Sequence, residues 1–287
     1  MKILLFLLAT FSIASAQTEP IVLMTTRTEG PPEPRLEVIA LIDHGQFKNP
    51  NTYKDKGAFI RQYLPKGREF FVVFGGGAAG TLNLTSTGLG CSDLIYAIGP
   101  WNAGALGMAR IHGRVQGLAT NSNMIARSEI WRRAPSNDER TAALQLAKGY
   151  FSNSGVTAAQ LTKMETVNLT AIDTDGDNHA ELAGTFSVPQ SDTNRPPRYL
   201  FLLAEGEGTN YKIATSSYRF YPKAESYNAG EEILIDYIDL DRNGTAEVVT
   251  SFTGEKDFGY RLYRYVNGDW NLVYETSTPL CVSEGGR

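Results

Sequence analysis

Two stretches of nine residues decide how the C-terminal part of this chain folds: Asp173-Thr174-Asp175-Gly176-Asp177-Asn178-His179-Ala180-Glu181 and Asp239-Leu240-Asp241-Arg242-Asn243-Gly244-Thr245-Ala246-Glu247. Both carry oxygen side chains at positions 1, 3, 5 and 9, and at position 6 a residue that tolerates left-handed backbone. Segments rich in β-branched and aromatic residues lie on both sides of each copy. The pattern therefore predicts a duplicated unit in which an acidic loop joins two β-strands.

The spacing of the oxygen atoms suits a hard cation, because Ca²⁺ takes about six to eight oxygen ligands in flexible geometry. Position 7 would add a backbone carbonyl, from His179 in the first copy and from Thr245 in the second. The second copy offers less negative charge, since it has an amide at position 5 and Arg242 beside it, so we expect two Ca²⁺ sites with the first one tighter. The alternative is a pair of metal-free turns, because Asp, Asn and Gly also favour turns for local reasons. The predicted ligands are Asp173, Asp175, Asp177, His179 and Glu181 in the first loop, and Asp239, Asp241, Asn243, Thr245 and Glu247 in the second.

The loops do not follow the EF-hand pattern, which places an acid at position 12 and continues into a helix. Position 12 is Gly184 in the first copy and Thr250 in the second, and a strand-like segment follows each loop. The pattern D-x-D-x-[DN]-[GN]-x-x-E between two strands instead resembles the calcium loops of FG-GAP and VCBS-type repeats of secreted proteins and integrin-like β-propellers. The resemblance is confined to the C-terminal part of the chain. It implies that each loop joins two strands of one blade and that positions 1, 3, 5 and 9 bind the ion.

The remaining patterns predict a mainly β fold with a small helical insert. Residues 36–131 predict a β barrel or sandwich with a short helix at 56–63, and residues 164–287 predict two four-stranded antiparallel, blade-like repeats. Between them, residues 132–163 predict a helical connector that begins with a capping box of Ser136 and Glu139 and packs between the domains. The Pro-rich residues 17–35 predict an extended leader with little structure. The segment Gly75–Gly80 has the letters of a dinucleotide-binding loop, but the strand-like sequence after it predicts a hairpin turn.

The N-terminus indicates export to a secreted or periplasmic location. Residues 1–16 combine Lys2, an apolar run and the small-residue pattern Ala14-Ser15-Ala16 of a signal peptide. No later apolar run is long enough to predict a membrane span. In an oxidising compartment two cysteines usually pair, so we expect a disulfide between Cys91 and Cys281.

Charge and motifs limit the function. The net charge of −4 disfavours nucleic acid as a partner. The chain has neither a G-x-S-x-G nucleophile elbow nor an H-E-x-x-H zinc helix, which favours a role without catalysis. The sequence thus predicts an exported calcium-binding repeat protein that binds an extracellular glycan or protein. The alternatives are a secreted hydrolase with dispersed catalytic residues and a purely structural envelope protein.

Overall fold

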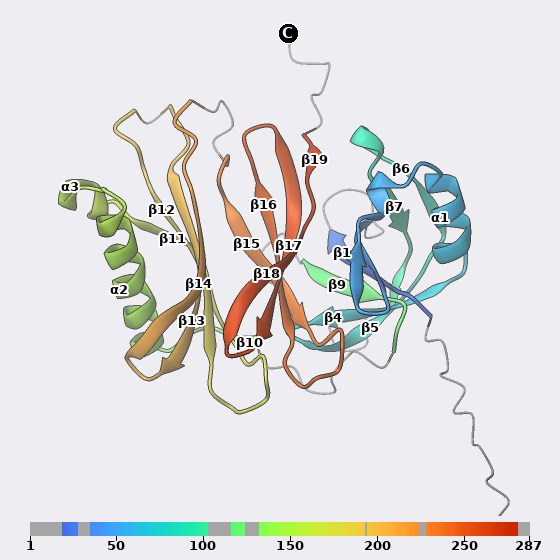
Figure 1. Cartoon of the computed structure of the whole chain (residues 1–287), viewed down its shortest axis with the longest axis horizontal. Coiled ribbons are helices and arrows are strands. Elements are labelled where there is room, and N and C mark those ends of the chain that lie inside the picture. Colours follow the sequence, from blue (N-terminus) through green and yellow to red (C-terminus); the bar gives the residue numbers. More distant parts are fainter. Residues whose placement is uncertain are drawn as a thin grey trace, which may run out of the picture.

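The computed structural model describes residues 19–27, 35–102, 116–123, 132–192, 194–223 and 228–280. They form three antiparallel sheets that stack side by side, with α2 and α3 at one end of the stack and α1 at the other (Figure 1). The order along the stack is helix α2, the first repeat sheet, the second repeat sheet, and the N-terminal sheet, whose outer end carries α1. This arrangement confirms the prediction of a mainly β fold with few helices.

The N-terminal sheet curls round its own core. Its strand order is β6-β7-β2-β1-β9-β4-β5-β8, with β3 paired to β2. β5 leads into β6, and β7 leads into β8. The strands at the two ends of this order therefore come from the same two segments of the chain, and the sheet curls into a half-barrel. The elements are β1 (Ile21–Arg27), β2 (Arg35–Asp43), β3 (Gln46–Lys48), η1 (Pro50–Thr52), α1 (Lys56–Tyr63), β4 (Glu69–Phe74), β5 (Gly77–Asn83), β6 (Ser86–Leu89), η2 (Cys91–Asp93), β7 (Ile95–Ile98), β8 (Trp101–Asn102) and β9 (Gly117–Thr120).

The two repeats are four-stranded meanders, as the sequence predicts. The first also carries a short extra strand, β10, and the second a short strand β19 beside β17. In the hairpin that joins β17 and β18, Asn267 and Gly268 both have positive φ, as a type I′ turn requires. The elements are β10 (Arg132–Arg133), α2 (Asn137–Asn153), α3 (Ala158–Leu161), β11 (Glu165–Ile172), β12 (Glu181–Val188), β13 (Arg198–Glu207), β14 (Asn210–Arg219), β15 (Glu232–Ile238), β16 (Glu247–Thr253), β17 (Asp257–Val266), β18 (Asp269–Glu275) and β19 (Thr278–Pro279).

Alternation along the strands explains the stacking, because successive side chains of a strand point to opposite faces of its sheet. In β13, Leu200 and Leu202 pack toward α2, whereas Phe201 and Leu203 pack against the second repeat sheet. In β16 of the second sheet, Val248 faces the first repeat and the next residue faces the N-terminal sheet. Both faces of both repeat sheets are therefore covered.

The prediction for residues 17–35 is wrong where the structure describes them. Residues 21–27 form β1, which lies between β2 and β9 in the N-terminal sheet. Its side chains Val22, Leu23 and Met24 are fully buried. The prolines that suggested an unstructured leader flank this strand at Pro20 and beyond its C-terminal end. The N-terminal domain thus begins before residue 36.

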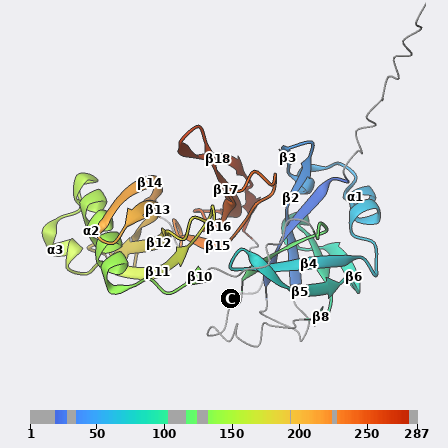
Figure 2. The same cartoon turned by 90° about the horizontal axis from the view of Figure 1, so that it is seen from below.

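The helical connector is correctly predicted as a helix but wrongly placed. The capping box at the start of α2 is present, with Ser136 and Glu139 bonded to each other's backbone N–H. However, α2 lies on the face of the first repeat sheet that points away from the N-terminal domain (Figure 2). Its apolar face, which includes Ala143, Ala147 and Phe151, covers that sheet. An exposed blade face needs such a cover, and the connector provides it.

The glycine-rich segment of the N-terminal domain forms a turn, as expected, and this turn docks on the second repeat. Asp236 of β15 accepts hydrogen bonds from the backbone N–H groups of Gly75 (2.8 Å) and Gly76 (3.2 Å). The hydroxyl of Tyr237 donates to the carbonyl of Gly75 at 2.8 Å. Gly76 has φ +74°, and a Cβ there would lie 2.3 Å from the Tyr237 ring. Glycine is required by contact with the neighbouring sheet and not by a phosphate.

Residues 1–16, the predicted signal peptide, lie outside the described residues. Within the described part of the chain, no helix combines the length and the apolar character needed to cross a membrane.

Candidate metal centre

The two acidic loops have left-handed backbone at the same two positions. Each connects the first and second strands of its repeat, β11 to β12 and β15 to β16. Position 6 has positive φ in both, 66° at Asn178 and 97° at Gly244, as predicted from the sequence. Position 4 also has positive φ, 81° at Gly176 and 60° at Arg242. An arginine in this left-handed region is uncommon, so the loop geometry is maintained even where the residue does not favour it.

Four hydrogen bonds recur at equivalent positions of the two loops. The backbone N–H of position 5 donates to the carboxylate of position 3 at 3.2 Å in both copies. That of position 6 donates to the aspartate at position 1, at 3.2 Å and 3.0 Å, and that of position 7 donates to the side chain of position 5, at 2.7 Å and 2.8 Å. The glutamate at position 9 accepts from the N–H of position 2 at 2.8 Å in each. The side chains thus turn inward toward one centre.

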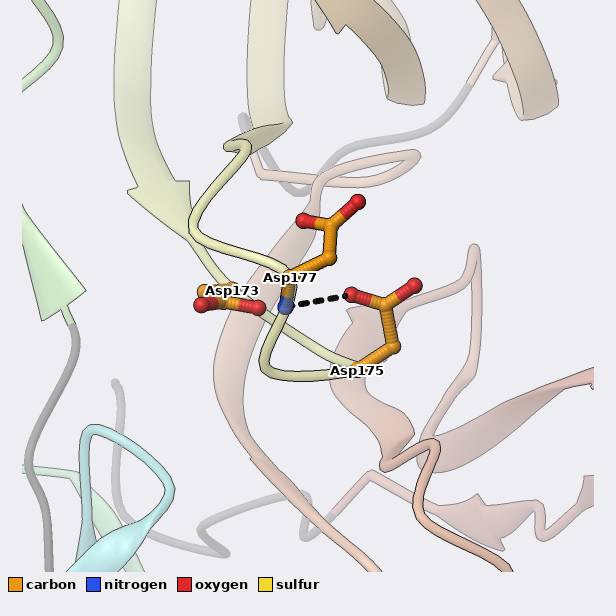
Figure 3. A group of neighbouring side chains, drawn as sticks. All are labelled: Asp173, Asp175 and Asp177. Carbon is orange, nitrogen blue, oxygen red and sulfur yellow. Dashed lines mark hydrogen bonds between the residues drawn. The ribbon is translucent and has the colours of Figure 1, made fainter.

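The first loop brings together Asp173, Asp175 and Asp177, each of which offers one carboxylate oxygen within 4.8 Å of the others (Figure 3). Two oxygens bound to one Ca²⁺ lie at most about 5 Å apart, given Ca–O distances of about 2.3–2.6 Å. The three side chains therefore fit a shared calcium ion. Burial raises the pKa of Asp175, and the charges of its two neighbours add to this effect. Such repulsion between carboxylates is relieved when a cation binds.

Two further predicted ligands of the first loop lie beside this group. Glu181 is buried, and its Oε2 accepts from both the N–H and the hydroxyl of Thr174 at 2.8 Å. Burial, together with the charges of Asp175 and Asp173, raises its pKa to about 7. The exposed ring of His179 lies 3.2 Å from Asp177. Hydrogen bonds from His179 lower the pKa of Asp177. The structure therefore groups three of the five predicted residues directly and places these two at the margin.

The second loop already contains a positive charge, which comes from Arg264 of β17. Its Nε lies 2.5 Å from Oε1 of Glu247, and its Nη2 lies 3.6 Å from Oδ2 of Asp241. The Glu247 side chain is fully buried and that of Arg264 is 18 % exposed. Both of these acidic groups were predicted ligands. The remaining predicted residues, Asp239, Asn243 and Thr245, keep the inward hydrogen bonds described above.

The two loops touch each other across the interface of the repeat sheets. The backbone N–H of Ala246 in the second loop donates to the carbonyl of Thr174 in the first at 2.7 Å. A cleft of about 350 Å³ opens beside this contact. It is lined by residues of both repeats, including Asp175, Glu181, Glu205 and the aromatic side chains of Tyr265 and Trp270. The indole N–H of Trp270 donates to Glu205 at 2.7 Å. An ion bound in the first loop would therefore lie at the junction of the two repeat sheets.

Two charged residues beside the loops, Glu205 and Arg264, were not predicted from the sequence; they lie on the third strands, β13 and β17. Neither belongs to a motif, and only the strand pairing places them opposite the loops. When the third strands are aligned by their pairing with the second strands, Glu205 of the first repeat stands at the position of Arg264 in the second.

Arg132 of β10 forms an interdomain contact: its Nη1 donates to the carbonyl of Ile235 at 3.0 Å, and its guanidinium lies over the Phe74 ring.

The predicted disulfide is only half described, because Cys281 lies outside the described residues. Cys91 is not a free thiol. The hydroxyl of the adjacent Ser92 donates to the carbonyl of Pro279 at 3.0 Å, which brings the C-terminal segment to Cys91. The pairing of Cys91 with Cys281 stays a prediction that this contact favours.

Comparison of the chain with protein-family models, with curated proteins and with solved structures gives no match.

Proposed function

We propose that this protein is an exported calcium-binding repeat protein in which one Ca²⁺ ion in the first acidic loop braces two blade-like sheets. The observation that carries the proposal is the group of Asp173, Asp175 and Asp177, whose carboxylate oxygens lie within 4.8 Å of one another. Hard cations prefer such oxygen ligands, and Ca²⁺ tolerates irregular geometry. The matching loop geometry of the second repeat supports the likeness to FG-GAP and VCBS-type repeats.

The position of the first loop explains what the ion would do for the fold. Three carboxylates in one turn repel each other, so the loop is costly to hold without a cation. The same loop accepts a backbone hydrogen bond from Ala246 of the second repeat. An ion that fixes the first loop would therefore also fix the junction of the two sheets. Binding energy of this kind adds to the stability of the folded state.

We further propose that the protein acts by binding an extracellular glycan or protein and not by catalysis. Loops held on rigid sheets are suitable for recognition. The cleft beside the first loop offers carboxylates and two aromatic side chains, Tyr265 and Trp270, within reach of both repeats. An ion in the loop would order one wall of this cleft. Glycan and protein arrays, probed with and without Ca²⁺, test this part of the proposal, and the absence of any ligand would favour a purely structural role.

Thermal unfolding in EDTA and in graded CaCl₂ tests the metal site. We expect the melting temperature of the wild-type chain to rise with calcium concentration, because a ligand that binds only the folded state stabilises it by about RT ln(1 + [L]/Kd). Asp175→Asn should abolish the rise. The matched control is Glu165→Gln, an equal charge change at the exposed start of β11, at the opposite end of that strand from the first loop, which should keep it. MgCl₂ at the same concentrations tests selectivity. An identical melting curve for the wild-type chain in EDTA and in millimolar calcium would refute the site.

A further inference from the structure

The residue opposite position 9 of the loop differs in charge between the two repeats. In the first repeat Leu182 pairs with Ala204, and in the second Val248 pairs with Tyr263. One step further along these antiparallel strands, Glu181 stands opposite Glu205, whereas Glu247 stands opposite Arg264. The side-chain ion pair between Glu247 and Arg264 confirms the second of these placements, and the shared cleft lining of Glu181 and Glu205 supports the first.

Electrostatics makes this difference important. Like charges directly opposite each other in an antiparallel pair destabilise it, and opposite charges stabilise it. The first repeat therefore adds acidic charge next to a loop that already holds three carboxylates. The second repeat adds a guanidinium, which contacts Glu247 and reaches to 3.6 Å from Asp241. Among the residues that the structure describes, no arginine or lysine forms an ion pair with the acidic groups of the first loop, whereas Arg264 forms ion pairs with those of the second.

The packing around Arg264 holds the guanidinium in this position. Its guanidinium carbon lies 5.2 Å from the centroid of the Phe47 ring in β3 of the N-terminal domain. Its Nη2 is buried and has no hydrogen-bond partner within the described residues, so the weak approach to Asp241 is the only interaction of this atom with an acidic group there. A cation fixed in this way competes directly with a metal ion for the same carboxylates.

We propose that Arg264 is the built-in cation of the second loop, and that the residue at this cross-strand position decides whether a loop takes Ca²⁺ from solution. The chain would then bind one Ca²⁺ and not two. This inference rests on the proposed function for the first loop only. For the second loop it predicts a latent site: removing the charge of Arg264 makes the two carboxylates that it contacts, those of Glu247 and Asp241, available to a metal ion.

Calcium titration calorimetry on the mature full-length chain tests this inference. We expect one Ca²⁺ per chain for the wild type, two for Arg264→Gln and one for Arg264→Lys, which keeps the charge. Asp175→Asn should reduce the wild-type count from one to zero and the Arg264→Gln count from two to one. The matched control is Arg242→Gln, the same charge change on the exposed rim of the same loop, which should leave the count at one. Circular dichroism verifies that each variant is folded. If the glutamine variant does not fold, Glu205→Arg preserves the test, because it places a cation at the same cross-strand position of the first repeat and should reduce the count from one to zero.

The possible outcomes separate the inference from the proposed function. Two ions on the wild-type chain, or one ion on both the wild type and Arg264→Gln, overturns the inference and leaves the first site intact. No ion on the wild type with one on Arg264→Gln refutes the first site and supports the inference. No ion on either refutes both. A second readout needs no calcium: in EDTA, Arg264→Gln should melt lower than Arg242→Gln by about 3–6 °C, and equal melting temperatures would show that Arg264 does not hold the second loop.

Discussion

The two repeats share a backbone but differ in the origin of their positive charge. Both are antiparallel meanders with an acidic loop between the first two strands, and the loops share four hydrogen bonds. In the second repeat β17 carries two arginines, Arg261 and Arg264, that pair with the buried carboxylates of Glu232 and Glu247. At the position of Arg261, judged by pairing with the second strand, the first repeat has the fully buried Leu202. The two repeats thus keep the same loop geometry, but single residues on the third strand decide whether the buried carboxylates are paired with arginine.

Removal of Arg261 should have the largest effect on this difference between the repeats. Its side chain is 2 % exposed and its ion pair partner Glu232 is 1 % exposed. Thr250 and Tyr263 also donate to Glu232, at 2.8 Å and 2.7 Å. Arg261→Met would leave a buried carboxylate without its counter-charge, so we expect a loss of about 3–5 kcal/mol in the free energy of unfolding. Urea denaturation measures this loss.

A double-mutant cycle shows whether the pair itself is responsible. In a Glu232→Gln background the carboxylate is absent, so Arg261→Met should cost clearly less than in the wild type. An equal cost in both backgrounds would mean that Arg261 acts through packing, for example its stacking on Phe252 at 4.5 Å, and that buried charge does not distinguish the second repeat.

The next test concerns how the second repeat is held, because its sheet packs against the N-terminal sheet. Gly76→Ala would place a Cβ 2.3 Å from the Tyr237 ring, in a residue with φ +74°. Gly45→Ala is a matched control, with φ +75° and no atom within 4 Å of its Cβ. The control carries only the backbone cost, about 1 kcal/mol, whereas Gly76→Ala adds a clash of about 1–3 kcal/mol. Equal unfolding free energies would show that the interface yields readily to the added methyl group.

The sequence predicts the repeats better than it predicts their surroundings, for a physical reason. Alternation, turn residues and loop spacing are local, so the strands from β11 to β18 and the left-handed positions Asn178 and Gly244 follow from the chain itself. Strand β1 does not, because flanking prolines conceal a buried segment whose partners, β2 and β9, lie elsewhere in the sequence. The same limit applies to the candidate site. The aspartates of the first loop form a motif, but Arg264 reaches the second loop only through strand pairing, which no local pattern records.

Asp236 in the second repeat should make the protein less stable as the pH rises. A salt-bridged surface carboxylate has the opposite effect. Burial raises its pKa to about 6, above the ordinary value of 3.8. The unfolded chain therefore ionises this group at lower pH than the folded chain, and stability is lost as the pH rises from about 4 through 6. The expected loss is about 2–3 kcal/mol relative to Asp236→Asn, which does not titrate. Denaturation of both chains at pH 4, 5, 6 and 7, in EDTA, measures it. A constant difference between them would show that the buried group does not titrate in this range.

The smallest expected effect comes from α2, the helix that covers the first repeat. Here stability should fall as the pH is lowered, which is the opposite of the effect of Asp236. Glu139 is held by Arg133, at 2.6 Å and 2.7 Å, and by the N–H of Ser136 at 2.6 Å. These partners lower its pKa to about 2 from 4.5. Their contribution is complete above about pH 4.5 and is lost as the pH falls through 2. Since Arg133 is 43 % exposed, solvent screens the pair, and we expect only about 1 kcal/mol between pH 5 and pH 3, relative to Glu139→Gln. If the wild-type chain instead loses stability relative to this variant as the pH rises, the carboxylate is stabilised by its proton and not by Arg133, and the two repeats would no longer differ in the sign of their response.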